Sequence, residues 1–408
     1  MWELDCALEF DSAHEENFFA ALPQRQGVLL IELRSAGGDA QPYLARTADI
    51  RRAAERLLRI PEAGAKRLNL REAAVRIRYR RTGSKFEQML AISEQARRYF
   101  RSTYRKRLRL RPPAVLKVNL RNSYPRCYVT RGIRPDEGFY YGPFASRRAA
   151  DAFLEGLLDF FKVRRCQIKI RRDPSFPGCI YSEMKMCLAP CFGGCSYEEY
   201  GTETARLLET LESSGAALTE AIEREREAAS DALDFERAAA LHKRLEKARA
   251  ALRGLPEIAR RIGELDAVIL QRSVEEMAIV VFPVRGGILR DPIPLRFAEI
   301  SSQPRSVEAI LREALDPAAV AAPAAEVSPV ETDPAPSPGT LRQKYGLKEI
   351  PPELSDHLAL VARWFYSNPR EGEIFFREAD WPYRRILRAC GRLLHPSGSE
   401  DATKAPKQ

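Results

Sequence analysis

The sequence lacks any long apolar run: no stretch of 18 apolar residues occurs among its 408 residues. A membrane-spanning helix needs about 20 such residues, so we expect no membrane span. The start, Met1 to Asp5, has neither a basic segment nor an apolar one, which disfavours a secretory leader. We therefore expect a cytoplasmic protein in a reducing compartment, where a disulfide framework is disfavoured.

Acidic residues are missing from one stretch, Arg101 to Cys127, in a chain whose net charge is +10. The stretch carries nine Arg or Lys residues and is interleaved with Tyr104 and Tyr124. A solvated basic face is one reading, but a run this long favours phosphate contacts and so DNA binding. The predicted DNA-binding residues are Arg105, Lys106, Arg107, Arg109, Arg111, Lys117 and Arg121.

The length predicts two or three domains, and an apolar content of 45% is ordinary for a globular protein. Apolar spacing in the first hundred residues indicates a small mixed α/β domain. Its expected elements are strands at 27–33, near Tyr43 and at 73–79, a turn at 36–39, and helices at 48–58 and 85–104.

Further along, the pattern predicts a strand near Tyr128, a tight turn at 141–144 and a helix over 147–161. Residues 200–253 read as helices with a bend at 233–236, and residues 265–289 as strands with a turn at 285–287. Six prolines and seven alanines in residues 317–339 indicate a linker. A short apolar helix is expected to end at Tyr366, and the polar tail after it is expected to be disordered.

Four of the eight cysteines gather in 26 residues with the spacing C-x12-C-x7-C-x3-C. They are Cys166, Cys179, Cys187 and Cys191. Four thiolates complete a tetrahedral set for zinc or for an iron–sulfur cluster, although buried unliganded thiols are the alternative. Cys195 could replace one ligand. We expect Cys6, Cys127 and Cys390 to be structural.

Several motifs in order resemble the UvrC family of excision-repair nuclease subunits, most strongly from Arg111 to Glu199. They include Arg111-Pro112, Ser123-Tyr-Pro125, Tyr141-Gly-Pro-Phe144 and Cys187-Leu-Ala-Pro-Cys191. The resemblance implies a [4Fe–4S] cluster held by the four cysteines, with zinc as the alternative. Only 42 residues follow Tyr366, so we expect neither a ribonuclease-H-like domain nor tandem helix–hairpin–helix motifs.

The helical region resembles the UVR module of that family through Leu233 and Phe235-Glu-Arg-Ala-Ala239. A UVR module pairs with a matching hairpin on UvrB, so the resemblance implies a UvrB-like partner. The implied contact residues are Leu233, Phe235, Glu236 and Ala239. A plain helical spacer is the alternative. At Arg226 and at His242-Lys243 the sequence departs from the pattern of the family, and these departures alter the charge of the expected interface.

The N-terminal domain stands where the family carries a GIY-YIG nuclease, whose chemistry needs a metal-binding carboxylate, a tyrosine and an arginine. Leu29 replaces the tyrosine of the first motif, and Tyr43-Leu-Ala-Arg-Thr47 corresponds to the second. Tyr43 and Arg46 are thus the remnant catalytic residues. Ala53 stands where the catalytic arginine is expected, although Arg51 and Arg52 are adjacent. Glu87 and Glu94 are the candidate carboxylates.

These observations predict an α+β multidomain protein. The expected parts are a degenerate GIY-YIG-like domain (1–111), a connecting region with the cysteine loop (112–200), a UVR-like hairpin (201–256), a β-rich region (257–316), a Pro/Ala linker (317–340), a helical segment (341–396) and a tail (397–408). The expected function is DNA binding in nucleotide excision repair without nuclease activity. The alternatives are an active single-incision endonuclease, which would need a divalent metal, and a zinc-stapled nucleic-acid binder outside repair.

Overall fold

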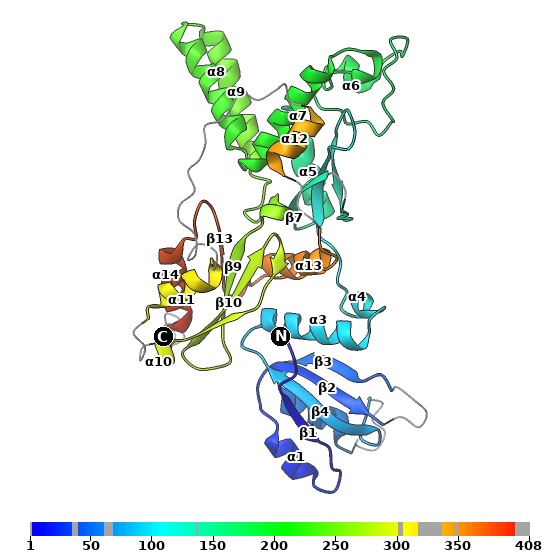
Figure 1. Cartoon of the computed structure of the whole chain (residues 1–408), viewed down its shortest axis with the longest axis vertical. Helices are drawn as coiled ribbons and strands as arrows, with labels where there is room; N and C mark the ends of the chain where they lie inside the picture. The colour runs from blue at the N-terminus through cyan, green and yellow to red at the C-terminus, as the bar shows by residue number, and fades with distance from the viewer. Residues whose placement is uncertain are drawn as a thin grey trace, which may run out of the picture.

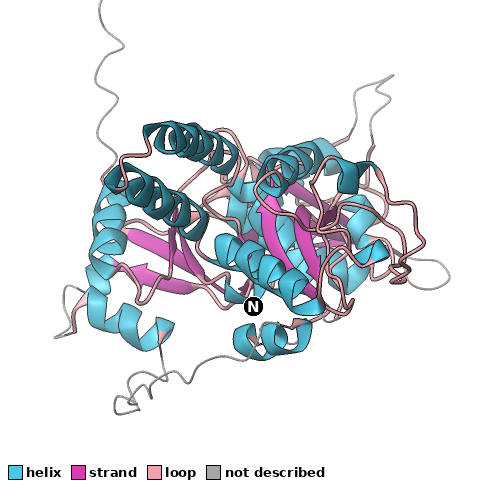
Figure 2. Cartoon of the chain, turned by 90° about the horizontal axis from the view of Figure 1, so that it is seen from above, coloured by secondary structure: helices cyan, strands magenta, loops and turns pink. Residues whose placement is uncertain are grey.

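The computed structural model describes residues 2–34, 40–60, 68–135, 138–300, 305–316, 337–346 and 350–395. The molecule is elongated, with the N-terminal sheet at one end and a helical hairpin and the cysteine loop at the other (Figure 1). Seen from above, the strands form separate sheets with helices around them (Figure 2). The chain therefore belongs to the predicted α+β class.

The N-terminal unit is an antiparallel sheet in the order β1-β4-β2-β3 with helices on both faces. One core packs β2 against α1 and α2, and another packs the opposite face of β2 against α3. The bounds are β1 Cys6–Glu9, α1 Glu15–Ala21, β2 Gly27–Leu33, β3 Tyr43–Thr47, α2 Ile50–Leu58, β4 Ala74–Arg81, α3 Lys85–Tyr99 and α4 Tyr104–Arg107. The sequence pattern missed β1 and α1, and the expected turn at 36–39 lies outside the described residues.

Side chains at the helix starts explain why α2 and α3 begin where they do. The Asp49 carboxylate accepts a hydrogen bond from the Arg52 amide, and the Ser84 hydroxyl accepts one from the Glu87 amide. Each satisfies an amide that has no partner within its helix. The Gln88 side chain then donates to the carbonyls of Gly27 and Thr47, which ties α3 to β2 and β3.

The middle unit is a sheet in the order β6-β5-β7-β8 covered by α5 and α7. The bounds are β5 Ala114–Asn119, β6 Cys127–Thr130, β7 Gly138–Phe144, α5 Arg147–Leu158, α6 Ile180–Glu183, η1 Pro190–Phe192, α7 Tyr197–Glu212 and β8 Arg260–Arg261. The predicted tight turn at 141–144 is wrong, because these residues are buried within β7. A Cβ on Gly142 would lie 3.0 Å from Val115, so glycine lets β7 approach β5 where their register shifts.

A two-helix hairpin follows, formed by α8 (Ala216–Asp231) and α9 (Phe235–Leu252). Leu218 and Ile222 of α8 and Leu245 of α9 are buried. They belong to the same core as Tyr200 and Leu207 of the preceding helix α7, so the hairpin packs on the middle unit. Within the predicted range 201–256, the two hairpin helices cover Ala216–Asp231 and Phe235–Leu252.

The last unit is built on the strand order β11-β10-β9-β13, with β12 paired to β10. Its bounds are η2 Ile262–Glu264, β9 Ala267–Arg272, β10 Ala278–Arg285, β11 Ile288–Leu289, β12 Ile293–Arg296, α10 Phe297–Ile300, α11 Val307–Leu315, α13 Leu354–Phe365, β13 Glu373–Phe376 and α14 Tyr383–Leu394. Because β13 pairs with β9, the regions predicted separately as 257–316 and 341–396 share one sheet. Most of the predicted linker, residues 317–336, lies outside the described residues, and so does the tail.

Helix α12 (Pro338–Tyr345) leaves this unit and packs on the middle one. Leu341 is buried in the middle core, and Arg342 donates a hydrogen bond to the Leu120 carbonyl at 2.6 Å. The predicted linker range 317–340 thus extends into a helix.

One core joins the two ends of the sequence. Trp2 stacks on Phe282 of β10 with ring centroids 5.8 Å apart, and Phe86 of α3 lies 5.4 Å from Trp364 of α13. The predicted domain 1–111 therefore shares its core with the last unit. Among the residues that the structure describes, no helix is both long and apolar enough to cross a membrane.

Candidate functional site

The cysteine loop runs from the end of α5 to the start of α7, and its first residues are fixed by the middle unit. The hydroxyl of Tyr200, a fully buried side chain, accepts a hydrogen bond from the Arg164 amide (2.9 Å) and donates one to the Pro125 carbonyl (2.8 Å). The Arg164 guanidinium donates to the carbonyls of Tyr124 and Ile168 and lies 3.9 Å from the Cys166 sulfur. The loop therefore begins from a rigid base.

All four predicted ligands line one cavity of about 180 Å³. The structure thus brings Cys166, Cys179, Cys187 and Cys191 together. Apolar side chains, one tyrosine and two arginines complete the wall, namely Ile168, Ile170, Phe176, Ile180, Ala189, Pro190, Tyr181, Arg164 and Arg165. Cys195 is not part of this wall and is buried in the middle core. All eight cysteines are free of disulfide bonds.

The electrostatics of this cavity disfavour bare thiolates. Burial raises the pKa of the Cys187 thiol to about 11, against a hydrogen bond from the Ala189 amide to its sulfur (3.3 Å). The neighbouring sulfurs of Cys166, Cys191 and Cys179 raise this pKa further. Four thiols around an apolar cavity are a donor set for a soft, positively charged centre, which would offset the cost of ionising them. No group of three or more His, Cys, Asp or Glu side chains in the described part of the chain is arranged to hold a metal ion.

The two remnant nuclease residues lie on opposite faces of the N-terminal sheet. Tyr43 packs with the core on the α2 side of β3, whereas its neighbour Leu44 packs with the core on the α3 side. Side chains alternate along a strand, so Arg46 shares the α3 side with Leu44. Arg46 is close enough to Arg363 of α13 to lower the pKa of that guanidinium, after the larger effect of burial. Tyr43 and Arg46 therefore do not converge.

The other candidate catalytic residues are engaged in structural contacts. Ala53 is buried in the core, and the Arg51 guanidinium donates to the carbonyls of Leu22 (2.8 Å) and Ala20 (2.7 Å). The Glu87 carboxylate is buried, accepts a hydrogen bond from the Gly83 amide at 2.7 Å, and has its pKa raised by burial. Glu94 is exposed at the rim of a cavity between α3 and α13. Neither of the two candidate carboxylates is therefore described in contact with Tyr43 or Arg46.

The predicted DNA-binding side chains divide into two groups. Those of Lys106, Arg107, Arg109, Arg111 and Arg121 are exposed around α4 and β5. Lys117 is the exception, because its side chain is buried, with Nζ 5.0 Å from the Tyr140 ring centroid. Lys117 is therefore not available to phosphate. Arg105 forms an ion pair with the buried Asp356 of α13 (2.8 Å), which sequence reasoning missed.

The tip of the hairpin exposes apolar side chains. Leu233 is 72% exposed and Phe235 is 67% exposed, where such residues are normally buried. Glu236 and Ala239 are exposed as well. Leu233 has φ +58, and this left-handed residue makes the sharp reversal between α8 and α9. All four predicted partner-binding residues are thus exposed. The hairpin of α8 and α9 that carries them projects from one end of the molecule (Figure 1).

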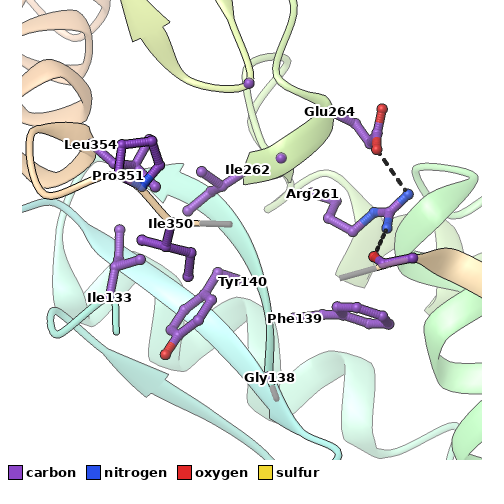
Figure 3. A pocket seen from close by; sticks show the side chains of 13 residues that line it. Ile133, Gly138, Phe139, Tyr140, Arg261, Ile262, Glu264, Ile350, Pro351 and Leu354 are labelled. Carbon is purple, nitrogen blue, oxygen red and sulfur yellow. Dashed lines mark hydrogen bonds and ion pairs between the residues drawn. The ribbon is translucent and has the colours of Figure 1, made fainter. Parts of the chain in front are cut away.

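A small cavity of about 60 Å³ lies between β7, η2 and the start of α13 (Figure 3). The Arg261 guanidinium in its wall pairs with Glu264 (3.3 Å) and donates to the Gly346 carbonyl (3.4 Å). Its apolar lining comes from Ile133, Tyr140, Ile262, Ile350, Pro351 and Leu354. The charged residues of the wall are paired with each other, so the cavity is a packing joint between the middle and last units.

The family model described as "UvrC/Cho excinuclease, middle domain" matches residues 114–210. The match runs from β5 to α7 and contains the whole cysteine loop. This segment is therefore similar to the middle domain of the UvrC/Cho family. The match confirms the resemblance to the UvrC family that was drawn from the ordered motifs.

Curated relatives support the same assignment. The UvrABC system protein C of Dehalococcoides mccartyi is 28% identical over 281 residues, which are 67% of this chain and 45% of the relative. The protein of that name from Treponema denticola is 37% identical over 99 residues, or 24% of this chain and 14% of the relative. The chain spans less than half the length of these UvrC relatives. No solved structure matches it.

Proposed function

We propose that this chain is a non-catalytic DNA-binding protein of nucleotide excision repair that docks a UvrB-type partner and carries a [4Fe–4S] cluster. The observation that carries the proposal is the family-matched segment 114–210, in which four cysteines line one cavity. This segment sits between two exposed surfaces suited to partners. One is the basic surface of Lys106, Arg107, Arg109, Arg111 and Arg121, and the other is the apolar tip of the hairpin.

The absence of nuclease activity is proposed from the arrangement of the N-terminal unit. Hydrolysis of a phosphodiester needs a carboxylate-held metal and groups that converge on one phosphate. Here Tyr43 and Arg46 face opposite sides of β3, and Glu87 is buried and bonded to Gly83. The unit would then serve as a scaffold that carries the basic surface.

The cluster is proposed from the donor set and from the room around it. The cavity of about 180 Å³ is several times the ~30 Å³ that a water molecule occupies, so it can hold a group of several atoms. Cys166, Cys179, Cys187 and Cys191 would hold the cluster. When bound, the cluster would cross-link the loop and supply the positive charge that the thiolates need.

The UvrB-type partner is proposed from the hairpin and from the names of the relatives, each a UvrABC system protein C. A second hairpin laid against α8 and α9 would bury Leu233 and Phe235. Buried aromatic anchors carry much of the binding energy in protein interfaces, which singles out Phe235.

A plasmid-nicking assay tests the catalytic part of the proposal. With Mg²⁺ or Mn²⁺ the purified protein should bind supercoiled plasmid and leave it uncut, because Tyr43 and Arg46 face opposite sides of β3 and Glu87 is buried. Nicking that disappears in the Tyr43→Phe variant would contradict the proposal. A protein that binds no DNA at all would contradict the DNA-binding part.

Metal analysis tests the cofactor. Protein purified without oxygen should be coloured and contain about four iron atoms per chain, and Cys187→Ser should lose most of this iron. Cys195→Ser is the matched control and should keep it, since Cys195 lies outside the cavity wall. Colourless protein that contains zinc would contradict the cluster and support the alternative, a zinc site.

A further inference from the structure

A second, larger cavity opens beside the cysteine loop. It is a groove of about 610 Å³ bounded by β6, α5 and the loop. β6 is the edge strand of the middle sheet, so this side of the strand is covered by the loop and not by another strand. The groove is lined by Arg126, Tyr128, Val129, Arg147, Asp151, Glu155, Arg165, Gln167, Tyr181 and Met186, among others.

Three arginines give the groove its charge. Arg147 and Arg165 each have one carboxylate partner, Asp151 at 3.4 Å and Asp159 at 3.0 Å. Both carboxylates are about half exposed, and ion pairs of this kind are weak and exchange readily. Arg126 has no carboxylate within ion-pairing distance among the described residues.

Arg126 is instead held against an aromatic ring. Its guanidinium carbon lies 4.4 Å from the ring centroid of Tyr128. A guanidinium stacked in this way offers its outer plane to a further flat group, such as a nucleobase. Tyr181 adds a second ring from α6 to the same groove, and both tyrosines are half-buried, so each keeps part of its surface open.

We propose that this groove binds a short stretch of single-stranded DNA. Phosphates would contact Arg126, Arg147 and Arg165, and bases would stack on the Arg126–Tyr128 pair and on Tyr181. This inference rests on the proposed DNA-binding function and names the form of DNA that the middle unit takes.

The chemistry of the lining favours a single strand over the other polyanions. Duplex DNA keeps the faces of its bases inside the stack, so it can offer phosphates but no free ring to the tyrosines. An acidic peptide has no flat bases to stack on Tyr128 and Tyr181. A single strand satisfies the charged and the aromatic parts of the groove together.

Alanine substitution of the two tyrosines tests the groove. Fluorescence anisotropy would measure binding of labelled oligothymidine of about ten nucleotides and of a duplex of equal length. Tyr128→Ala and Tyr181→Ala should each weaken binding of the single strand about tenfold and leave duplex binding within about twofold. The phenylalanine variants at both positions should bind like the unchanged protein, because they keep the ring.

Met277→Ala is the control, since it removes an exposed apolar side chain between β9 and β10 and should leave both affinities unchanged. Circular dichroism of each variant checks that the fold is intact. If both alanine variants keep their affinity for the single strand, the groove is not the binding site. The same conclusion follows if the affinity for the duplex falls equally, or if polyglutamate displaces the oligonucleotide completely. A protein that binds neither form of DNA would instead refute the proposed function itself.

Discussion

At the scale of single residues, Asp356 shows how a basic segment is fixed in place. Its carboxylate is buried and accepts hydrogen bonds from the Tyr104 hydroxyl and from the Arg105 guanidinium. Arg363 of the same helix donates to the carbonyls of Leu108 and Arg109. Helix α13 therefore sets the backbone from which Lys106, Arg109 and Arg111 project, and Arg105 acts as part of that support.

Removing this carboxylate should cost stability. We expect Asp356→Ala to lower the free energy of unfolding by about 2 kcal/mol, because Tyr104 and Arg105 lose a buried partner. Urea unfolding measures the change. Asp291→Ala, which removes an exposed carboxylate after β11, should have almost no effect. Equal stability of the two variants would contradict this role.

Glu87 gives a prediction for pH dependence. Burial raises the pKa of this carboxyl group, so the folded state holds the proton more tightly than the unfolded chain does. Its contribution to stability is therefore lost as pH rises above the ordinary carboxyl pKa of about 4.3. The Glu87→Gln variant should gain stability over the unchanged protein between about pH 4 and pH 7, measured by urea unfolding. If the difference in unfolding free energy between the two proteins stays constant across this range, the pKa of Glu87 is not raised by folding. If Mn²⁺ stabilises the unchanged protein and not the variant, Glu87 binds metal and is not purely structural.

At the scale of elements, the hairpin uses different residues for its folding and for the proposed binding of a partner. Leu245 of α9 is fully buried between the helices, whereas Phe235 projects from the tip. Leu245→Ala should lower the unfolding free energy by about 3 kcal/mol, and Phe235→Ala should leave it nearly unchanged while weakening capture of UvrB at least tenfold. Pull-down and thermal unfolding check the pair. UvrB capture that survives Phe235→Ala would move the interface away from the tip.

The basic segment allows a matched comparison of charge. The Lys106→Ala/Arg111→Ala double variant should lower the slope of log affinity against log salt for duplex DNA by up to about 2. The Arg384→Ala/Arg388→Ala variant removes two exposed charges from α14, on the opposite side of the molecule from α4 (Figure 1), and should leave the slope unchanged. An equal change in both variants would mean that net charge alone governs binding.

Sequence patterns predicted the elements whose apolar spacing is regular, such as β2, α3, α5, β10 and α13. They missed the short edge strands β1 and β13, because four residues carry too little periodicity and their partners lie 67 to 73 and 103 to 109 positions away, respectively. The four cysteines were predicted as a set, and the structure gathers them at one cavity. Buried Lys117 could not be foreseen, because only the folded chain places Tyr140 beside it. The opposite facing of Tyr43 and Arg46 could have been foreseen, since residues three apart on a strand point to opposite sides.

At the scale of the whole molecule, the first and last units should unfold together. Phe282 is fully buried and contacts both Trp2 and Phe86. Phe282→Ala should lower the free energy of unfolding by about 4 kcal/mol. Hydrogen exchange should then show that the amides of β2 and of β9 lose protection to the same extent. Destabilisation of β9 with unchanged protection of β2 would show that the two units fold separately.

The same shared core has a consequence for synthesis on the ribosome. Residues 2–100 emerge first, yet the apolar face of α3 finds Trp364 only after some 260 further residues have been translated. For most of translation the nascent chain therefore displays an uncovered surface around Phe86 and Trp2, which is the kind of surface that chaperones bind. The first unit can complete its core only after α13 has been synthesised. Binding of chaperones to the nascent chain should therefore fall sharply once α13 has left the exit tunnel.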